Sequence, residues 1–285
     1  MAKATGRTRA RRAEPDSPAE IWDDEDGGHD LPPERPEPRR RKPRATRPPP
    51  EEPRPGLLRR LRTYALRAAL ILILLALALL ALPGAIDPPI TPYAWSEGRR
   101  LGGIDQSWVT LDEIAPVMAR ATVAAEDAEF CNHWGLDLRA IRAAMAAGGD
   151  RGGSTISQQV TKNVFLWHGR SWARKAIEAG ITPVLEALWS KRRILELYLN
   201  VAEFGPGIFG VEAAAQRYFG IPASDLSPNQ AARLAVILPA PKDRDPRDLS
   251  DRLLARVDQV IDGAATIAAD GRAACFEGAP REAGP

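Results

Sequence analysis

An uncharged run of 19 residues, 68–86, constrains this chain more than any other feature. Leu, Ile and Ala dominate it, and a helix of that length, rising about 1.5 Å per residue, crosses the hydrocarbon layer of a bilayer. A buried core helix is the alternative. A cleaved signal peptide is disfavoured because 67 residues precede the run. We therefore expect a single membrane-spanning anchor over residues 65–87.

The charges on the two sides of this run predict its orientation. Four arginines precede it at positions 59, 60, 62 and 67, whereas the 19 residues that follow hold only Arg99 and Arg100. Because positively charged flanks stay in the cytoplasm, we expect everything from about Asp87 onward outside it. Residues 1–67 hold 17 Lys or Arg, 12 Asp or Glu and 12 of the 26 prolines. Without apolar periodicity such a segment cannot bury a core, so residues 1–64 are expected to be a disordered cytoplasmic arm.

Composition excludes several functional classes for the rest of the chain. The net charge of the whole chain is only +2, which argues against a nucleic-acid partner. Two cysteines cannot build a disulfide scaffold or a Cys-rich zinc module, and three histidines give no metal-binding spacing. Whether Cys131 and Cys275 pair is left open by the sequence.

The exported part reads as a series of helices, with a domain over residues 88–250 and a C-terminal helix and tail over 251–285. No segment shows a convincing period-two alternation, so the class is mainly α. Pro at a first helical position and Ser or Thr at N-caps mark the helix starts: Pro116, Ser154 or Thr155, Ser171, Ser190 and Ser227. Pro183 should kink or split the helix in which it lies.

The first segment with more polar content than packing needs ends a helix at Glu126-Asp127. A carboxylate placed against an apolar helix should have a raised pKa, which suits a general base or acid. A solvated pair of helix-end acids is the alternative. His133 is interpreted as a hydrogen-bonded structural residue.

Two further segments carry polar side chains on single helical faces. Thr155, Gln159 and Lys162 share a face, and a row of hydroxyl and amide groups can bind a carbohydrate. The spacing of Arg174, Lys175 and Glu178 also brings their side chains together, as in ordinary surface ion pairs. With Lys162 and Arg170, these cations could neutralise a diphosphate. Residues 191–205 read as a packed helix whose end supports the site.

The sequences EDAEFCNHWG, GGSTISQQVTKN, RKAIE and KRRILELYLN followed by FG resemble, in order and spacing, the signature motifs of the peptidoglycan glycosyltransferase family. These enzymes polymerise lipid II into glycan strands. The resemblance covers about residues 105–241. No Ser-Lys transpeptidase motif follows, so the chain resembles the monofunctional members of the family rather than the bifunctional ones. It implies a lysozyme-like α-helical fold with a smaller membrane-touching lobe, on a single-pass anchor in the bacterial inner membrane.

The resemblance also implies roles for individual residues. Glu126 falls on the catalytic base and Glu178 on the second essential acid, which would orient cations or help to hold a divalent cation (Mg or Mn); no organic cofactor is implied. The substrate-binding positions are Asp127, which would also support Glu126, and Ser154, Thr155, Gln159, Lys162, Asn163, Arg170, Arg174 and Lys175. The reaction would invert the donor anomeric carbon and release undecaprenyl diphosphate.

The expected partners are lipid II, the growing glycan strand, the membrane, and proteins of cell-wall synthesis or division. Residues 164–167 and Trp172 would either face lipid or pack in the core. Cys131 departs from the family pattern, which commonly has an aromatic residue there. Two other functions stay open: a lysozyme-like enzyme that cleaves peptidoglycan, and a non-catalytic membrane scaffold.

Overall fold

A computed structural model describes residues 56–146, 153–169 and 171–278 of the chain, so most of the expected disordered arm lies outside it. The first helix, α1 (Leu57–Ala81), continues into the short 3-10 turn η1 (Leu82–Gly84). Together they are long and apolar enough to cross a membrane, with a mean hydropathy of 2.8 and no buried residue in the most apolar window.

The helix begins earlier than the sequence pattern predicts. Residues 57–64 were expected to belong to the disordered arm, and they are helical. Leu and Arg, both good helix formers, fill most of this stretch, so the helix extends back to Gly56, its N-cap. Pro83, which has no amide hydrogen to donate, lies in the 3-10 turn near the end of the apolar run.

The remaining elements are mostly helices. The helices are α2 (Pro92–Leu101), α3 (Pro116–Glu126), α4 (Leu138–Ala146), α5 (Ile156–Phe165), α6 (Trp172–Leu188), α7 (Lys191–Val201), α8 (Val211–Phe219), α9 (Pro228–Ile237), α10 (Asp251–Ala269) and α11 (Ala274–Glu277). Further 3-10 turns are η2 (Leu111–Glu113), η3 (Phe130–Asn132) and η4 (Ala223–Asp225). The mainly helical class is confirmed.

A small sheet accompanies the helices. Its strands β1 (Asp105–Gln106), β2 (Glu203–Gly205) and β3 (Ile208–Phe209) lie in the order β1-β3-β2. The β1–β3 pair is parallel, and the β2–β3 pair is antiparallel with an irregular register. Strands of two or three residues are too short to show a period-two pattern, which explains why the sequence did not reveal them.

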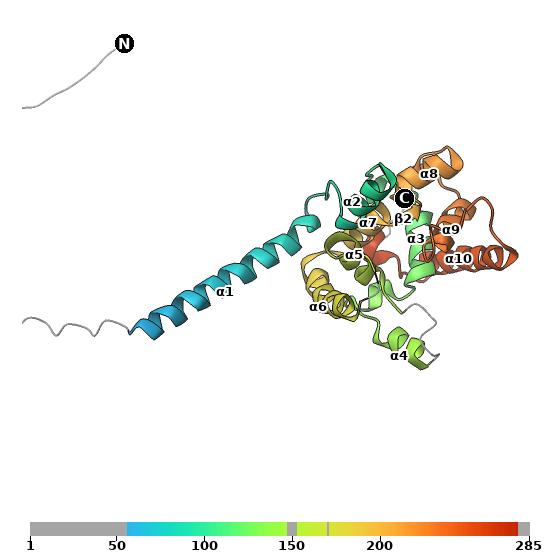
Figure 1. Cartoon of the computed structure of the whole chain (residues 1–285). Coiled ribbons are helices and arrows are strands. Elements are labelled where there is room, and N and C mark those ends of the chain that lie inside the picture. Colours follow the sequence, from blue (N-terminus) through green and yellow to red (C-terminus); the bar gives the residue numbers. More distant parts are fainter. Residues whose placement is uncertain (1–55, 147–152, 170, 279–285) are drawn as a thin grey trace, which may run out of the picture. The chain divides into compact units, whose positions relative to one another are not determined.

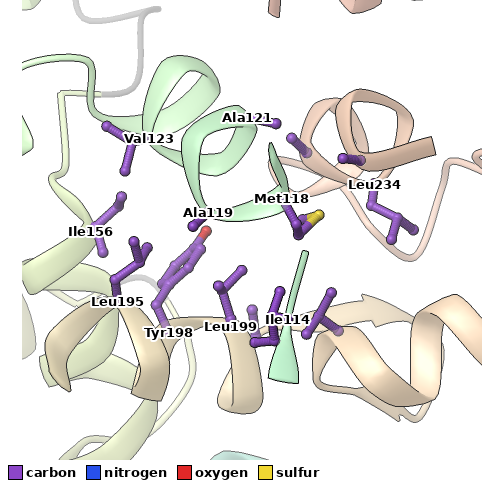
Figure 2. Close-up of a cluster of buried hydrophobic side chains, with 14 of the residues drawn as sticks. Ile114, Met118, Ala119, Ala121, Val123, Ile156, Leu195, Tyr198, Leu199 and Leu234 are labelled. Carbon is purple, nitrogen blue, oxygen red and sulfur yellow. The ribbon is translucent and has the colours of Figure 1, made fainter. Parts of the chain in front are cut away.

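Helix α7 lies at the centre of the hydrophobic core. Leu195, Leu197, Tyr198 and Leu199 are all at most 1% exposed. Side chains of α3, including Met118, face Tyr198 and Leu199 across the core (Figure 2). On another side α7 packs against α5, which packs in turn against α6 (Figure 1). This packing fixes the end of α3 relative to α5 and α6.

The C-terminal helix belongs to the same core. Helices α3, α9 and α10 pack against one another, and Val257, Val260, Ala264 and Ile267 of α10 are buried in the main cluster. The boundary expected at residue 250 therefore does not separate α10 from the domain. The sequence motifs did not reveal that α10 belongs to the domain, because α10 contributes apolar packing and carries no motif.

Most of the expected helix starts are confirmed. Pro116 is the first residue of α3, and Ser171, Ser190 and Ser227 cap α6, α7 and α9. Pro183 lies inside α6 without splitting it.

The apolar segment near the end of α5 divides between the core and the surface. Val164 and Leu166 are buried, whereas Trp167 is half exposed and Trp172 is 91% exposed. Core packing therefore describes Val164 and Leu166, and contact of the exposed Trp167 and Trp172 with lipid stays a prediction.

A disulfide joins Cys131 to Cys275, with their Cα atoms 5.8 Å apart. The structure thus decides the pairing that the sequence left open. The bond connects the chain just after α3 to the short helix α11, 144 residues later.

Candidate active site

A cavity of about 500 Å³ lies where the end of α3, the start of α5, the first half of α6 and the end of α9 meet. Charged and amide side chains form most of its wall. Its lining residues are Ala125, Glu126, Ser154, Gln158, Gln159, Lys162, Arg174, Lys175, Glu178, Leu238 and Pro239. It joins acid and base groups from separate helices around one space large enough for part of a sugar chain.

Glu126 is the last residue of α3, and its carboxyl group is held by α5. Gln159 Nε2 donates a hydrogen bond of 2.7 Å to Glu126 Oε2. The Tyr198 hydroxyl donates to Gln159 Oε1 over 3.3 Å, which orients the amide so that its NH₂ faces Glu126. Burial raises the pKa of Glu126, and this effect exceeds the lowering by Gln159 and by the charge of Lys162. The raised pKa that the sequence led us to expect is confirmed.

The start of α5 is fixed by a capping box. Thr155 is the N-cap: its hydroxyl accepts from the Gln158 amide over 3.2 Å and donates to the Gly135 carbonyl over 2.5 Å. This decides between Ser154 and Thr155 as the cap. Ser154 Oγ instead faces the cavity and accepts from Lys175 Nζ over 2.7 Å.

Asp127 ties the end of α3 to the start of α5. Its Oδ2 accepts from the backbone amide of Ile156 over 3.0 Å, and its Oδ1 lies 2.9 Å from His133 Nε2. Asp127 is buried and does not line the cavity. The contact confirms the structural interpretation of His133, and it gives Asp127 a place beside Glu126 as a support.

Glu178, on α6, lies between two cations. Its Oε2 is 2.7 Å from Arg174 Nη1 and its Oε1 is 2.5 Å from Lys175 Nζ. The side chains of Glu178 and Arg174 are only 3% and 12% exposed, whereas that of Lys175 is 38% exposed. The carboxylate is therefore largely desolvated, unlike the solvated surface pair that spacing alone indicates. Two positive charges around one negative charge leave the cluster with an excess of one positive charge.

Lys162 adds a further cation to the same cavity. Burial lowers its pKa, while the nearby Glu178 opposes that effect. Among the described residues, Lys162 has no ion-pair partner within salt-bridge distance. Its ammonium group is therefore available to a negatively charged ligand in the cavity.

A second cavity of about 350 Å³ adjoins the first, and the two share Gln159 and Lys162. Asn163 lines it, and its buried Oδ1 has no hydrogen-bond partner among the described atoms. His168 stacks on Tyr93 with ring centroids 3.3 Å apart. Burial and the charge of Lys162 lower the pKa of His168 to about 4, so its ring is neutral at pH 7.

Sequence reasoning missed part of this second cavity. Tyr93 donates to Glu203, and Lys242 pairs with Glu203 over 3.5 Å. These three residues come from α2, β2 and the segment after α9, and none shares a helical face with the motifs. Of the three, only Glu203 lies in a segment that the sequence had pointed to, residues 191–205.

The structure brings most of the expected site residues together. Those that line the first cavity are Glu126, Ser154, Gln159, Lys162, Arg174, Lys175 and Glu178. Asn163 lines the second cavity, and Asp127 and Thr155 act as buried supports behind the wall. Arg170 lies outside the described residues. Leu238 and Pro239, an apolar wall at the end of α9, were not expected in the site.

The donor set near Glu178 does not form a metal site by itself. Both of its carboxylate oxygens already accept from cationic groups. No cluster of three or more His, Cys, Asp or Glu side chains suited to a metal exists within the described ranges. A divalent cation here would need to take most of its oxygen ligands from a bound substrate.

Comparison with known proteins gives one consistent answer. A family model described as "Transglycosylase" matches residues 97–265. A biosynthetic peptidoglycan transglycosylase of Jannaschia sp. (strain CCS1) is 55% identical over 220 residues, covering 77% of this chain and 92% of that protein. Proteins of the same name from Pectobacterium carotovorum subsp. carotovorum (strain PC1) and Rhodospirillum centenum (strain ATCC 51521 / SW) are 48% and 45% identical. They cover 65% and 77% of this chain, and 81% and 96% of their own lengths are matched.

Replacing the α5 cap tests how the site is held. Thr155→Val keeps the side-chain shape but removes the hydroxyl that caps α5 and binds Gly135, so we expect a loss of about 1–2 kcal/mol in the free energy of unfolding. Ser154→Ala, one residue earlier, removes a hydroxyl that caps nothing and should change this free energy little. Denaturant unfolding of both variants measures the difference. Equal losses would show that Thr155 is not the cap that matters.

Proposed function

This chain belongs to the transglycosylase family and is a glycosyltransferase of peptidoglycan, and we propose that it polymerises lipid II into glycan strands. The observation that carries this proposal is the single cavity shared by a partly buried carboxyl group, that of Glu126, and the cations Lys162, Arg174 and Lys175. A glycosyl transfer from a lipid diphosphate needs both: a base for the attacking hydroxyl and positive charge for the departing diphosphate.

We propose that Glu126 is the general base. Its carboxylate accepts the proton of the 4-hydroxyl of the acceptor N-acetylglucosamine as that oxygen forms a bond to C1 of the donor N-acetylmuramic acid. The bond between C1 and the phosphate oxygen breaks, and its electron pair leaves with undecaprenyl diphosphate. Attack opposite the leaving group inverts C1. The raised pKa of Glu126 supports this role, because a base with a pKa nearer the working pH removes a proton more effectively.

The cations on α5 and α6 would meet the negative charge that develops on the diphosphate. Arg174 can donate to two phosphate oxygens at once, whereas Lys162 and Lys175 act as point charges. Glu178 holds Arg174 and Lys175 in place through its two oxygens. Because these groups are fixed before substrate binds, little reorganisation is needed at the moment of transfer. In this role Glu178 positions the cations and does not touch the reacting atoms.

Ser154, Gln159 and Asn163 are proposed to bind the sugars and the diphosphate of the substrates. Ser154 faces the first cavity, and the orphaned Oδ1 of Asn163 faces the second. A buried acceptor without a partner favours a ligand that brings a hydrogen-bond donor. The N-acetyl amides of the two sugars supply such donors.

We further propose that α1 anchors the chain in the bacterial inner membrane, with the catalytic domain outside the cytoplasm. The apolar span and the four arginines at its N-terminal side support this orientation. The disulfide between Cys131 and Cys275 supports it independently, because disulfides persist in oxidising compartments. A lipid-linked substrate would then reach the cavity from the same membrane.

A chelator tests how the diphosphate is neutralised. Since the oxygens of Glu178 are occupied by Arg174 and Lys175, we expect polymerisation of lipid II by the purified full-length chain to persist when divalent cations are removed with EDTA. Loss of polymerisation in EDTA, restored by adding Mg²⁺ or Mn²⁺, would show instead that a divalent cation shares this task.

Removing the proposed base tests the function itself. The full-length chain, incubated with lipid II in detergent, should lengthen glycan chains and should release no muropeptides from isolated sacculi. Glu126→Gln should lower the rate of polymerisation by about 10²–10⁴-fold. Its thermal midpoint should not fall, because a neutral amide is cheaper to bury than a carboxylate. Release of muropeptides without chain growth would favour the cleaving enzyme, and undiminished polymerisation by the variant would exclude Glu126 as the base.

The charge of Lys162 should be visible in the pH profile. Lys162 lowers the pKa of Glu126, so Lys162→Met should raise that pKa further. Because the base works only when ionised, the acidic limb of kcat/KM should move to higher pH, and kcat should fall by about 10²-fold. The matched control is Lys242→Met, which removes a cation paired with Glu97 and Glu203 and should leave the limb in place. An unmoved limb in Lys162→Met would contradict the coupling.

A further inference from the structure

The loop that follows Glu126 is covalently bound to the C-terminal end of the domain. Cys131 lies in η3, five residues after Glu126, and its disulfide partner Cys275 lies in α11. The family model ends at residue 265, so α11 lies beyond the part of the domain that it matches. None of the catalytic roles proposed above uses this segment.

Non-covalent contacts strengthen the same attachment. Arg272 Nη1 donates to the carbonyl of Ala128 over 3.0 Å and lies 3.7 Å from Glu129 Oε1. Phe276 is fully buried, and its ring centroid is 6.5 Å from that of Phe130, which is also fully buried. Three kinds of contact thus converge on the loop 127–133, and all three come from residues 272–276.

Helices of the shared domain hold α11 from its other side. Arg192 Nη1, on α7, donates to the Phe276 carbonyl over 2.9 Å, and Arg120 of α3 lies 3.2 Å from Glu277. The segment is therefore not a loose tail attached only through a disulfide. It is a fixed support that transfers the rigidity of α3 and α7 to the loop.

The opposite side of the loop faces α5. Asp127 accepts from the Ile156 amide and contacts His133, and Glu126 accepts from Gln159. The loop is thus held between α5, which carries part of the active-site cavity wall, and the C-terminal segment, which contributes no residue to that cavity. Release from the C-terminal side would leave the loop attached through Asp127 to the Ile156 amide and through Lys191 of α7, which donates to the His133 carbonyl over 2.7 Å and lies 4.4 Å from the Phe130 ring centroid.

We propose that residues 272–276, through the disulfide and Arg272, form a clamp that positions Glu126 for catalysis. This inference rests on the proposed role of Glu126 as base. The clamp residues act through the loop and touch no substrate. An error of about 1 Å in the placement of a catalytic group can cost up to about 10²-fold in rate, so a loosened loop should slow turnover while the substrate-binding walls on α5 and α6 stay intact.

The clamp makes a distinct prediction for the pH profile. The charged and titratable groups around Glu126 are Asp127, Lys162 of α5, Tyr198 of α7 and Arg256 of α10. Opening the clamp removes none of these groups. A loosened loop admits water to Glu126 and weakens the burial that raises its pKa. The acidic limb of kcat/KM should therefore move to lower pH, which is opposite to the shift expected for Lys162→Met.

The first test reduces the disulfide in the folded full-length chain with dithiothreitol. The reagent is oxidised to its cyclic disulfide while Cys131 and Cys275 each gain a hydrogen atom, and iodoacetamide then caps both thiols. We expect kcat for lipid II polymerisation to fall about tenfold, KM to change less than twofold, and the acidic limb to move to lower pH. Removal of the reductant and reoxidation of an uncapped sample should restore all three.

The second test uses a matched pair of arginines, which keeps the inference testable if the reduced protein unfolds. Arg272 and Arg247 each pair with an aspartate two residues earlier over 2.7 Å, but only Arg272 also binds the loop. Arg272→Ala should lower kcat several-fold and speed hydrogen exchange of the amides of residues 128–132, while Arg247→Ala should do neither. Equal effects of the two variants, or a reduced folded protein with unchanged kcat and pH limb, would overturn the clamp.

Hydrogen exchange separates this inference from the proposed function. If the oxidised wild-type chain fails to polymerise lipid II, the proposed function fails. The clamp is then judged on exchange in the loop alone, where protection unaffected by reduction or by Arg272→Ala would refute it.

Discussion

The contact on which the rest of the site depends is the one between Glu126 and Gln159. It joins the last residue of α3 to the fourth residue of α5 through a hydrogen bond of 2.7 Å, and it holds a partly buried carboxyl group at the cavity wall. Burying that group is unfavourable for its charged form. The surrounding structure opposes this cost with an oriented amide, a nearby ammonium group and the rigid packing of α3 and α5 on α7. The fold thus controls the pKa of the carboxyl group that we propose as the base.

Charge balance explains why the second acid lies on α6. Three cations facing one cavity would repel one another, and each would be costly to desolvate alone. Glu178 lowers that cost by accepting from Arg174 and Lys175 at once, and it leaves an excess of positive charge for the substrate. Lys162, which has no ion-pair partner among the described residues, contributes the cation that is most readily shared with a negatively charged ligand, and such a ligand would offset the lowering of its pKa by burial. The same helices therefore supply both the groups that we propose to react and the charges that stabilise them.

Local patterns in the sequence predicted the helical class, most helix starts and most cavity residues, because caps, helix faces and motif spacing are properties of contiguous segments. Through-space properties could not be predicted. The pairing of Cys131 with Cys275 joins residues 144 positions apart, and the packing of α10 beside α3 shows only as ordinary apolar periodicity. The choice of Thr155 over Ser154 as the cap depends on Gly135, 20 residues earlier. Tyr93 and Lys242 meet Glu203 from distant elements, so neither carried a local signal.

The central claim is that one cavity holds the base and the diphosphate-binding cations at the same time. A crystal structure of the Glu126→Gln chain with lipid II bound tests it most directly, since the variant should bind substrate without consuming it. We predict a diphosphate in contact with Lys162 and Arg174, with a sugar hydroxyl within hydrogen-bond distance of residue 126. A diphosphate bound elsewhere, with the cavity between α3, α5 and α6 free of sugar, would contradict it.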